Sequence, residues 1–143
     1  MSSAAEARFR VPAPASVARV VNVVALEPGC DDVLVRLSER SWKGVSFFPA
    51  SAVVGRNREL VETIASGDLV VMVAAAGSDA SAAAFIGRAC SDRRVHTAAF
   101  VLRDSSTADE ALSRTLAQVR PWSLMVVIAG EEGYVEDLLR SFR

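Results

Sequence analysis

The sequence predicts an α/β domain of three layers, a Rossmann-like arrangement in which helices cover both faces of a mostly parallel sheet of five strands. The first observation is that five short apolar runs do not alternate with polar residues, which is typical of strands buried on both faces of a sheet. The second is that a helical pattern follows each run. Strand and helix repeated in this order favour parallel strands joined by right-handed crossovers.

The first half of the chain is expected to form two strands and two helices. Residues 17–26 (VARVVNVVAL) are the first apolar run, and residues 31–40 follow with leucines on one side and charges on the other, as in an amphipathic helix. The pair Lys43-Gly44 turns the chain into a second strand at residues 45–49. Residues 58–65 (RELVETIA) place their apolar side chains on one helix face, and a Ser-Gly pair ends that helix.

The second half continues with the most apolar run of all. Residues 69–74 (LVVMVA) are expected at the centre of the sheet, and the small residues at 78–90 predict a helix that can pack closely on it. The remaining elements are indicated by apolar runs, capping residues and acidic first turns, and they are a strand at 97–102, a helix at 107–119, a strand at 124–129 and a helix at 131–142.

Composition restricts the class of protein. The chain has 143 residues, 51% of them hydrophobic, and a net charge of −1, which fits one domain at residues 17–143 after a leader at 1–16. Without a basic stripe, no nucleic-acid partner is expected. No apolar run reaches the roughly 18 to 20 residues that cross a bilayer, so no membrane partner is expected. The two cysteines lack CxxC spacing, which indicates reduced thiols in the cytoplasm.

The candidate site lies in the turns after residues 26 and 74, because ligands of doubly wound sheets gather at the carboxyl ends of strands near the point where strand order reverses. The first turn holds Gly29, Cys30, Asp31 and Asp32. Its glycine could bring a backbone N–H to an anion, whereas its carboxylates would repel a phosphate. The alternative is that Asp31 or Asp32 caps the helix that follows.

The second turn, at residues 75–81, is the better candidate for a pocket. Gly77 permits a tight turn, and Ser78, Asp79 and Ser81 offer hydroxyls and a carboxylate beside a helix N-terminus. The same residue types begin ordinary helices, so a purely structural cap is the alternative.

Neither a catalytic site nor a metal site is expected. Cys30 stands beside a helix N-terminus, a setting that can lower the pKa of a thiol and make it reactive. The single histidine, His96, precedes a strand and should lie at the opposite edge of the sheet, too far away to act as a base for that thiol. One histidine also provides no typical zinc ligand set.

From about Ala18 onward, the turn at residues 27–31, the Lys43-Gly44-Val45 turn into a second strand and the turn at residues 77–83 stand in an order of strands and helices that resembles the N-terminal GTP-binding domain of the FtsZ/tubulin family. Residues 20–48 (VVNVVALEPGCDDVLVRLSERSWKGVSFF) are similar to that family's first strand, glycine-rich loop, helix and Lys-Gly-Val turn into a second strand. Residues 58–102 resemble its "Asp, apolar strand, glycine signature, Ala-rich helix, apolar strand" order, and residues 120–139 its next strand and helix.

The resemblance implies phosphate loops at residues 27–31 and 77–83, which is where this chain departs from the family. Of the consecutive and alternating glycines of those loops it keeps Gly29 and Gly77, with Ser81 as a hydroxyl of the second loop. The acidic loop that the family's GTPase activity needs from a later segment is not found either. The resemblance thus implies a degenerate nucleotide site with no bound cofactor and no catalytic residue.

Three hypotheses for function follow. The first is a non-catalytic Rossmann-like protein that acts through protein contacts or an altered small-ligand pocket. The second is a small-molecule enzyme or sensor that uses the two turns. The third is a self-associating structural module, because the last helix carries four large apolar residues that could leave a face uncovered, Tyr134, Leu138, Leu139 and Phe142.

Overall fold

The computed structural model describes residues 20–54 and 58–142, and these form one parallel five-stranded sheet between two layers of helices. The strands lie in the order β2-β1-β3-β4-β5, and each pairs in parallel with its neighbours. The predicted three-layer α/β class is confirmed, and so is the central place of the most apolar strand. The strands are β1 (Val21–Ala25), β2 (Val45–Phe48), β3 (Leu69–Ala75), β4 (His96–Leu102) and β5 (Met125–Ala129).

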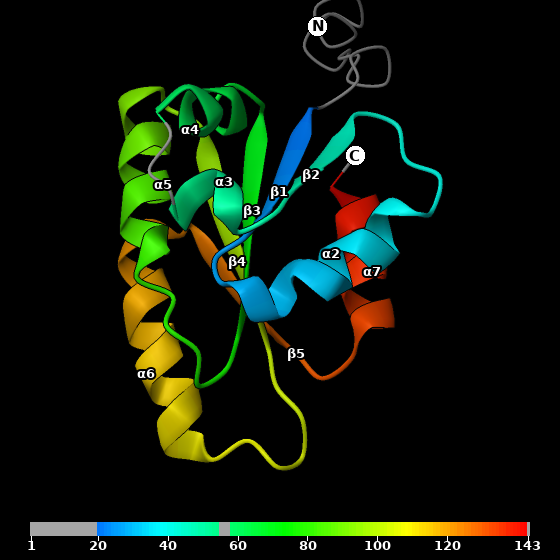
Figure 1. The fold of residues 1–143 in the computed structure, drawn as a ribbon, viewed down its shortest axis with the longest axis vertical. Coiled ribbons are helices and arrows are strands. Elements are labelled where there is room, and N and C mark those ends of the chain that lie inside the picture. Colours follow the sequence, from blue (N-terminus) through cyan, green and yellow to red (C-terminus); the bar gives the residue numbers. More distant parts are fainter. Residues whose placement is uncertain (1–19, 55–57, 143) are drawn as a thin grey trace, which may run out of the picture.

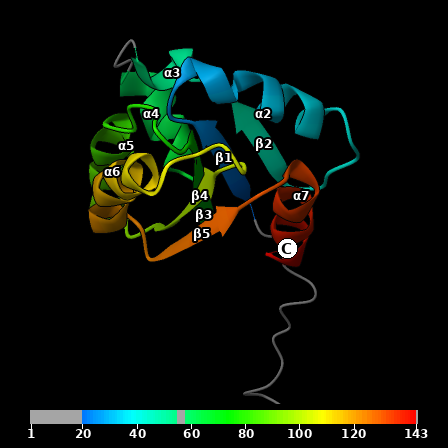
Figure 2. The same ribbon diagram turned by 90° about the horizontal axis from the view of Figure 1, so that it is seen from below.

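The helices divide between the two faces of the sheet, as Figure 1 and Figure 2 show. One layer contains α2 (Asp31–Ser38) and α7 (Glu132–Ser141). The other contains α4 (Arg58–Ile64), α5 (Ala82–Asp92) and α6 (Asp109–Val119), with the short α3 (Ser51–Val54) beside them. Two 3-10 turns complete the described chain, η2 (Pro28–Cys30) and η3 (Arg120–Trp122). The expected leader at residues 1–16 lies outside the described residues.

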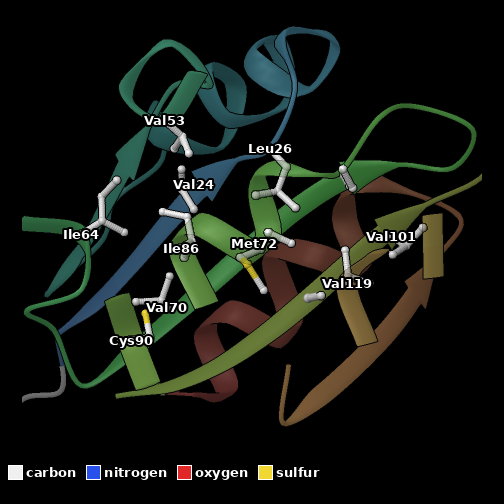
Figure 3. Packing of buried hydrophobic residues seen from close by; sticks show 14 of the residues in the cluster. Val24, Leu26, Val53, Ile64, Val70, Met72, Ile86, Cys90, Val101 and Val119 are labelled. Atoms are coloured by element: carbon white, nitrogen blue, oxygen red, sulfur yellow. The ribbon is translucent and has the colours of Figure 1, made fainter. Parts of the chain in front are cut away.

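Each strand of the central sheet contributes to two hydrophobic cores. On β3, Val70 and Met72 pack with α4, α5 and α6, whereas Val71 and Val73 pack with α2 and α7. Figure 3 shows the first of these cores, in which Val70 and Met72 lie among side chains from the helices. The β3 residues between its ends are fully buried, which explains why its sequence carries no polar alternation.

Ion pairs join α2 to α7 across the same face of the sheet. Arg36 contacts Glu132 at 2.8 Å, and Arg40 contacts Glu136 at 2.6 Å. Glu136 also contacts Arg140 on its own helix at 3.0 Å. The hydrogen bond from Arg140, followed by that from Arg40, holds the pKa of the Glu136 carboxyl below its usual value. These ion pairs join the exposed sides of the two helices, whereas their buried sides pack against the sheet.

The apolar face of α7 is covered, contrary to the expectation that it could lie open. Leu139 is fully buried with Val135 against the sheet, and Leu138 and Phe142 are half-buried against the same core. Tyr134 is the one expected residue that stays exposed.

Two close approaches of the backbone fix the packing on the other face. A Cβ added at Gly87 would lie 2.6 Å from Trp122 Cβ, so only glycine lets η3 pack onto α5 at this point. On β1, the buried Asn22 donates from Nδ2 to the carbonyl of Ile64 at 2.7 Å, which holds the end of α4 against the strand. A Cβ at Gly67 would lie 3.0 Å from that same nitrogen.

The helix expected at residues 78–90 begins later and ends later than predicted, at Ala82–Asp92. The chain first makes a turn in which Gly77 adopts a φ of 93° and the Asp79 carboxylate accepts the backbone N–H of Ser81. The short α3 was not expected at all. The helix expected at 107–119 begins two residues later, at Asp109, and the strand expected from residue 124 begins at Met125.

Candidate functional site

The two expected turns lie side by side at the carboxyl edge of the sheet. β1 stands between β2 and β3, so strand order reverses there, and its register with β3 runs from Val21 opposite Leu69 to Ala25 opposite Val73. The two turns therefore lie, as expected, at the carboxyl ends of neighbouring strands where strand order reverses. A cavity of about 360 Å³ lies between them, lined by the first turn, the second turn and an apolar floor, namely Leu26, Glu27, Pro28, Val53, Asp79, Ser81, Ala82 and Phe85.

In the first turn, a carboxylate of the chain occupies the position where an anion would bind. Oε2 of Glu27 accepts the backbone N–H of Gly29 at 2.7 Å, and Oε1 accepts the thiol hydrogen of Cys30 at 3.0 Å. A Cβ placed on Gly29 would lie 2.7 Å from the same Oε2. The space that a phosphate loop leaves open over its glycine is thus filled by Glu27.

Cys30 has the opposite character from the reactive thiol that its place in the sequence could give. Its side chain is buried, at 1% exposure. Burial is the largest cause that raises the pKa of the Cys30 thiol well above its usual value, and the hydrogen bond to Glu27 and the charge of that carboxylate raise it further. The lowered pKa that a helix N-terminus can give is therefore not found, because burial and then the Glu27 carboxylate both favour the protonated thiol.

The two aspartates of the first turn do not reach into the cavity. Asp31 accepts the backbone N–H of Ala50 at 2.8 Å and so ties the start of α2 to the segment after β2. Asp32 is exposed in the first turn of α2. Cys30 holds the N-cap position of α2, without a capping hydrogen bond from its side chain, so neither aspartate is the N-cap. Both still lie at the positive end of the helix dipole.

In the second turn, backbone donors are taken by side chains of α6. The N–H of Gly77 donates to Oγ1 of Thr115 at 2.9 Å, and the N–H of Ala80 donates to Oε1 of Gln118 at 2.7 Å. Thr115 is fully buried. The N–H of Ser78 donates to the carbonyl of Ala75 at 3.0 Å.

Asp79 closes the second turn on its other side. Its Oδ1 accepts the N–H of Ser81 at 3.0 Å and Nε2 of Gln118 at 3.0 Å. The backbone hydrogen bond from Ser81, then the Ser81 hydroxyl and Gln118, hold the pKa of the Asp79 carboxyl below its usual value. Asp79 is therefore a fixed negative charge on the rim of the cavity.

Three residues that build this edge were missed as structural acceptors. The carboxylates of the first turn were considered only as charges that repel phosphate, although Glu27 stands two residues before a glycine and can accept a hydrogen bond from that glycine's N–H. Thr115 and Gln118 are three residues apart on a helix, which places both on one face. Two polar residues on the side of a helix that packs against the domain could have indicated that they bond to a neighbouring turn.

The single histidine lies away from this edge. His96 pairs in register with Leu69 at the amino end of the sheet, as expected. Within residues 20–54 and 58–142, no group of three or more His, Cys, Asp or Glu side chains is placed to hold a metal ion. Among the helices of this same part, none has both the length and the apolar character to cross a membrane.

The chain was compared with protein families and with curated proteins. No protein-family model matches the chain, and no curated protein matches it. The fold and the two turns define the chain as a doubly wound α/β domain. At the point where strand order reverses, side chains of the domain itself accept hydrogen bonds from the backbone N–H groups of the turns. Function has to be inferred from those residues.

Proposed function

We propose that this chain is a non-catalytic α/β domain that does not bind nucleoside phosphates at its switch point and acts through contacts with other proteins. The single observation that supports the lack of nucleoside phosphate binding is the occupation of N–H donors in both turns by side chains of the chain itself. Contacts with other proteins are the function we propose for a domain without that ligand.

The physical reason is that phosphate binding needs backbone N–H groups that point at the ligand without competing acceptors. At the first turn a phosphate would have to displace the Glu27 carboxylate from Gly29. At the second it would have to displace Thr115 and Gln118. Since two carboxylates also border the cavity, an anion would be repelled while it competed.

The same positions carry the proposed relationship to the FtsZ/tubulin family. Its two phosphate loops would correspond to residues 27–31 and 77–83, the segments that Glu27 and the α6 side chains bond. A relative with these substitutions would keep the frame of the domain and lose its triphosphate. We propose that relationship as the origin of the two-turn geometry.

The experiment is isothermal titration calorimetry of the full chain with GTP, GDP and ATP, with and without Mg²⁺. No heat of binding is expected in any titration. A dissociation constant tighter than about 10 μM, which corresponds to about −7 kcal/mol, would overturn the proposal. The matched control is inorganic phosphate, because binding of phosphate alone would show that the N–H donors are open.

A second candidate function is a sensor or enzyme for a small ligand, and the cavity between the turns favours it. Its volume of about 360 Å³ lies within the range of small-molecule sites. Its floor is apolar and its rim carries Glu27 and Asp79, so the ligand that fits is a small apolar amine.

That candidate is tested by thermal unfolding in the presence of a panel of alkyl and aryl amines at millimolar concentration. Stabilisation by one amine, lost in Ala82→Leu and kept in Ala84→Leu, would support it, because Ala82 lines the cavity and Ala84 does not. If no amine raises the unfolding temperature, the cavity is not such a site.

A further inference from the structure

The outer edge of β5 is the feature of the fold that most needs a partner. Within residues 20–54 and 58–142, β5 ends the sheet and pairs with β4 alone, so a row of its backbone N–H and C=O groups faces away from the described sheet. Residues 124–130 (LMVVIAG) contain no charge and no proline, the two residue classes that usually protect such an edge. Leu124 is 75% exposed, Met125 40% and Ile128 43%.

The apolar surface continues from β5 onto α7. Glu132 and Glu136 face the arginines of α2, and Tyr134 lies two residues from each of them, about 200° around the helix. Tyr134 therefore points away from α2 and toward the β5 side. It is 48% exposed. Four of the seven exposed large hydrophobic residues of the described chain thus lie on β5 or beside it.

The opposite edge of the sheet is better protected. β2 has four residues, includes the exposed Ser46, and is followed directly by Pro49. A proline has no N–H to donate to an incoming strand. Of the two edge strands of the sheet, β5 is the one whose sequence would allow another strand to pair with it.

Charges on α6 indicate the direction in which a partner strand would run. Arg120 follows Ala111 by nine residues, half a rotation around the helix, and Ala111 faces the second turn beside α5. Arg120, which directly follows the last residue of α6, and Asp109, the first residue of that helix, therefore lie on the side toward β5. Asp109 is 95% exposed and its contact with Arg103 is long, at 3.4 Å.

We infer that the outer edge of β5 pairs with the same edge of a second copy of this chain, antiparallel across a two-fold axis perpendicular to the sheet. Such an axis keeps α6 next to α6 and reverses its direction, so Asp109 of each copy approaches Arg120 of the other. A parallel arrangement would need an axis along the strands, which would turn α6 of the second copy to the other face of the sheet and leave Asp109 and Arg120 without these partners. One patch that complements itself is the requirement of a two-fold dimer.

The pairing would join the two sheets into one and cover the apolar side chains of both edges. It would satisfy the outward backbone groups of β5, since antiparallel edge strands exchange N–H and C=O bonds along their length. This inference rests on the proposed function in one respect, because it identifies a second copy of the chain as the protein partner that the proposed function requires. The nucleotide titrations and the assembly measurements below therefore fail independently.

The experiment is sedimentation velocity on the full chain from about 10 to about 500 μM, a range that resolves weak and moderate dimers. The wild type should sediment as a dimer at the upper concentrations. Leu124→Lys should weaken the dimer by at least about tenfold, because a charge on the seam is buried without a partner. Val35→Lys, at a residue 56% exposed on α2, is the matched control and should leave the dimer unchanged.

A charge exchange tests the antiparallel direction. Arg120→Glu should weaken the dimer, and Arg120→Glu combined with Asp109→Arg should restore it, because each copy would again place opposite charges together. High salt should weaken the wild-type dimer for the same reason. A double variant as weak as the single one would overturn the antiparallel assignment.

The inference is overturned if the wild type stays a monomer at the highest concentration, if Leu124→Lys dimerises like the wild type, or if Val35→Lys weakens the dimer equally. Open-ended assemblies in place of a dimer would also overturn it, since a two-fold contact closes. Circular dichroism confirms that each variant is folded. Ile128→Lys repeats the test at a second exposed site of the strand.

Discussion

Replacing Glu27 by alanine removes the acceptor that closes the first turn. Two hydrogen bonds are lost, one from the N–H of Gly29 at 2.7 Å and one from the thiol of Cys30 at 3.0 Å. Replacement by glutamine keeps an oxygen that can accept from Gly29 and removes the charge. Comparison of the two variants therefore separates the bond from the charge.

The magnitude follows from the geometry of these bonds. A lost capping acceptor destabilises a protein by about 0.5–2 kcal/mol, and the short charge-assisted bond to Gly29 places Glu27→Ala in the upper half of that range, at about 1.5 kcal/mol. The thiol bond adds little, because S–H is a weak donor. For Glu27→Gln we expect less than about half of this loss, since a neutral acceptor keeps the bond.

Urea denaturation followed by circular dichroism measures both variants, with Glu39→Ala as a control at an exposed carboxylate of the same segment. The unfolding temperature of Glu27→Ala should also fall by roughly 3–6 °C. In both Glu27 variants the pKa of Cys30 should fall and still remain above its usual value, since burial is the larger cause. If Glu27→Ala matches the wild type, or if glutamine is as harmful as alanine, the carboxylate does not close the turn.

Three further changes test the packing around the site. Asn22→Leu should destabilise by about 2 kcal/mol in urea, because the carbonyl of Ile64 loses its buried donor. Gly87→Ala should destabilise by about 1 kcal/mol by the same assay, since its Cβ meets Trp122 and the clash exceeds the gain in helix propensity. Glu136→Gln should be less stable than the wild type at pH 7, and the difference should narrow as pH falls below about 4.5, because a lowered carboxyl pKa stabilises the fold only while that group is ionised.

The fold could be predicted because its signals are local. Continuous apolar runs identified all the strands, and β3 was correctly expected at the centre because its run was the most apolar. The positions of the two turns followed from the repeated strand and helix order. Helix starts were less certain, because the turn at residues 78–81 depends on bonds from Asp79 and α6 that no local pattern shows.

The chemistry of the site could not be read from the turns alone. Thr115 and Gln118 are almost forty residues away from the donors they bond, and only the packing of α6 beside α5 brings them there. The exposed apolar surface was also expected on the wrong element. The order of strands decides which of them is an edge, and no single segment shows that order. Leu124, Met125 and Ile128 are therefore exposed at β5, whereas Tyr134 is the only one of the four residues expected on α7 that stays exposed.

The two turns differ in how firmly they exclude an anion. In the first turn, the blocking carboxylate is that of Glu27, which belongs to the turn itself, is half-buried and can rotate away. The free energy needed to expose the N–H of Gly29 to an anion is therefore that of one capping hydrogen bond, to which the repulsion between the carboxylate and the anion is added. In the second, the acceptors belong to α6, and Thr115 is fully buried, so opening the donors requires movement of a packed helix. If the proposed relationship holds, a triphosphate would have to contact both turns. The second turn therefore determines the result of the nucleotide titration, and a change at Glu27 alone should leave the protein unable to bind GTP.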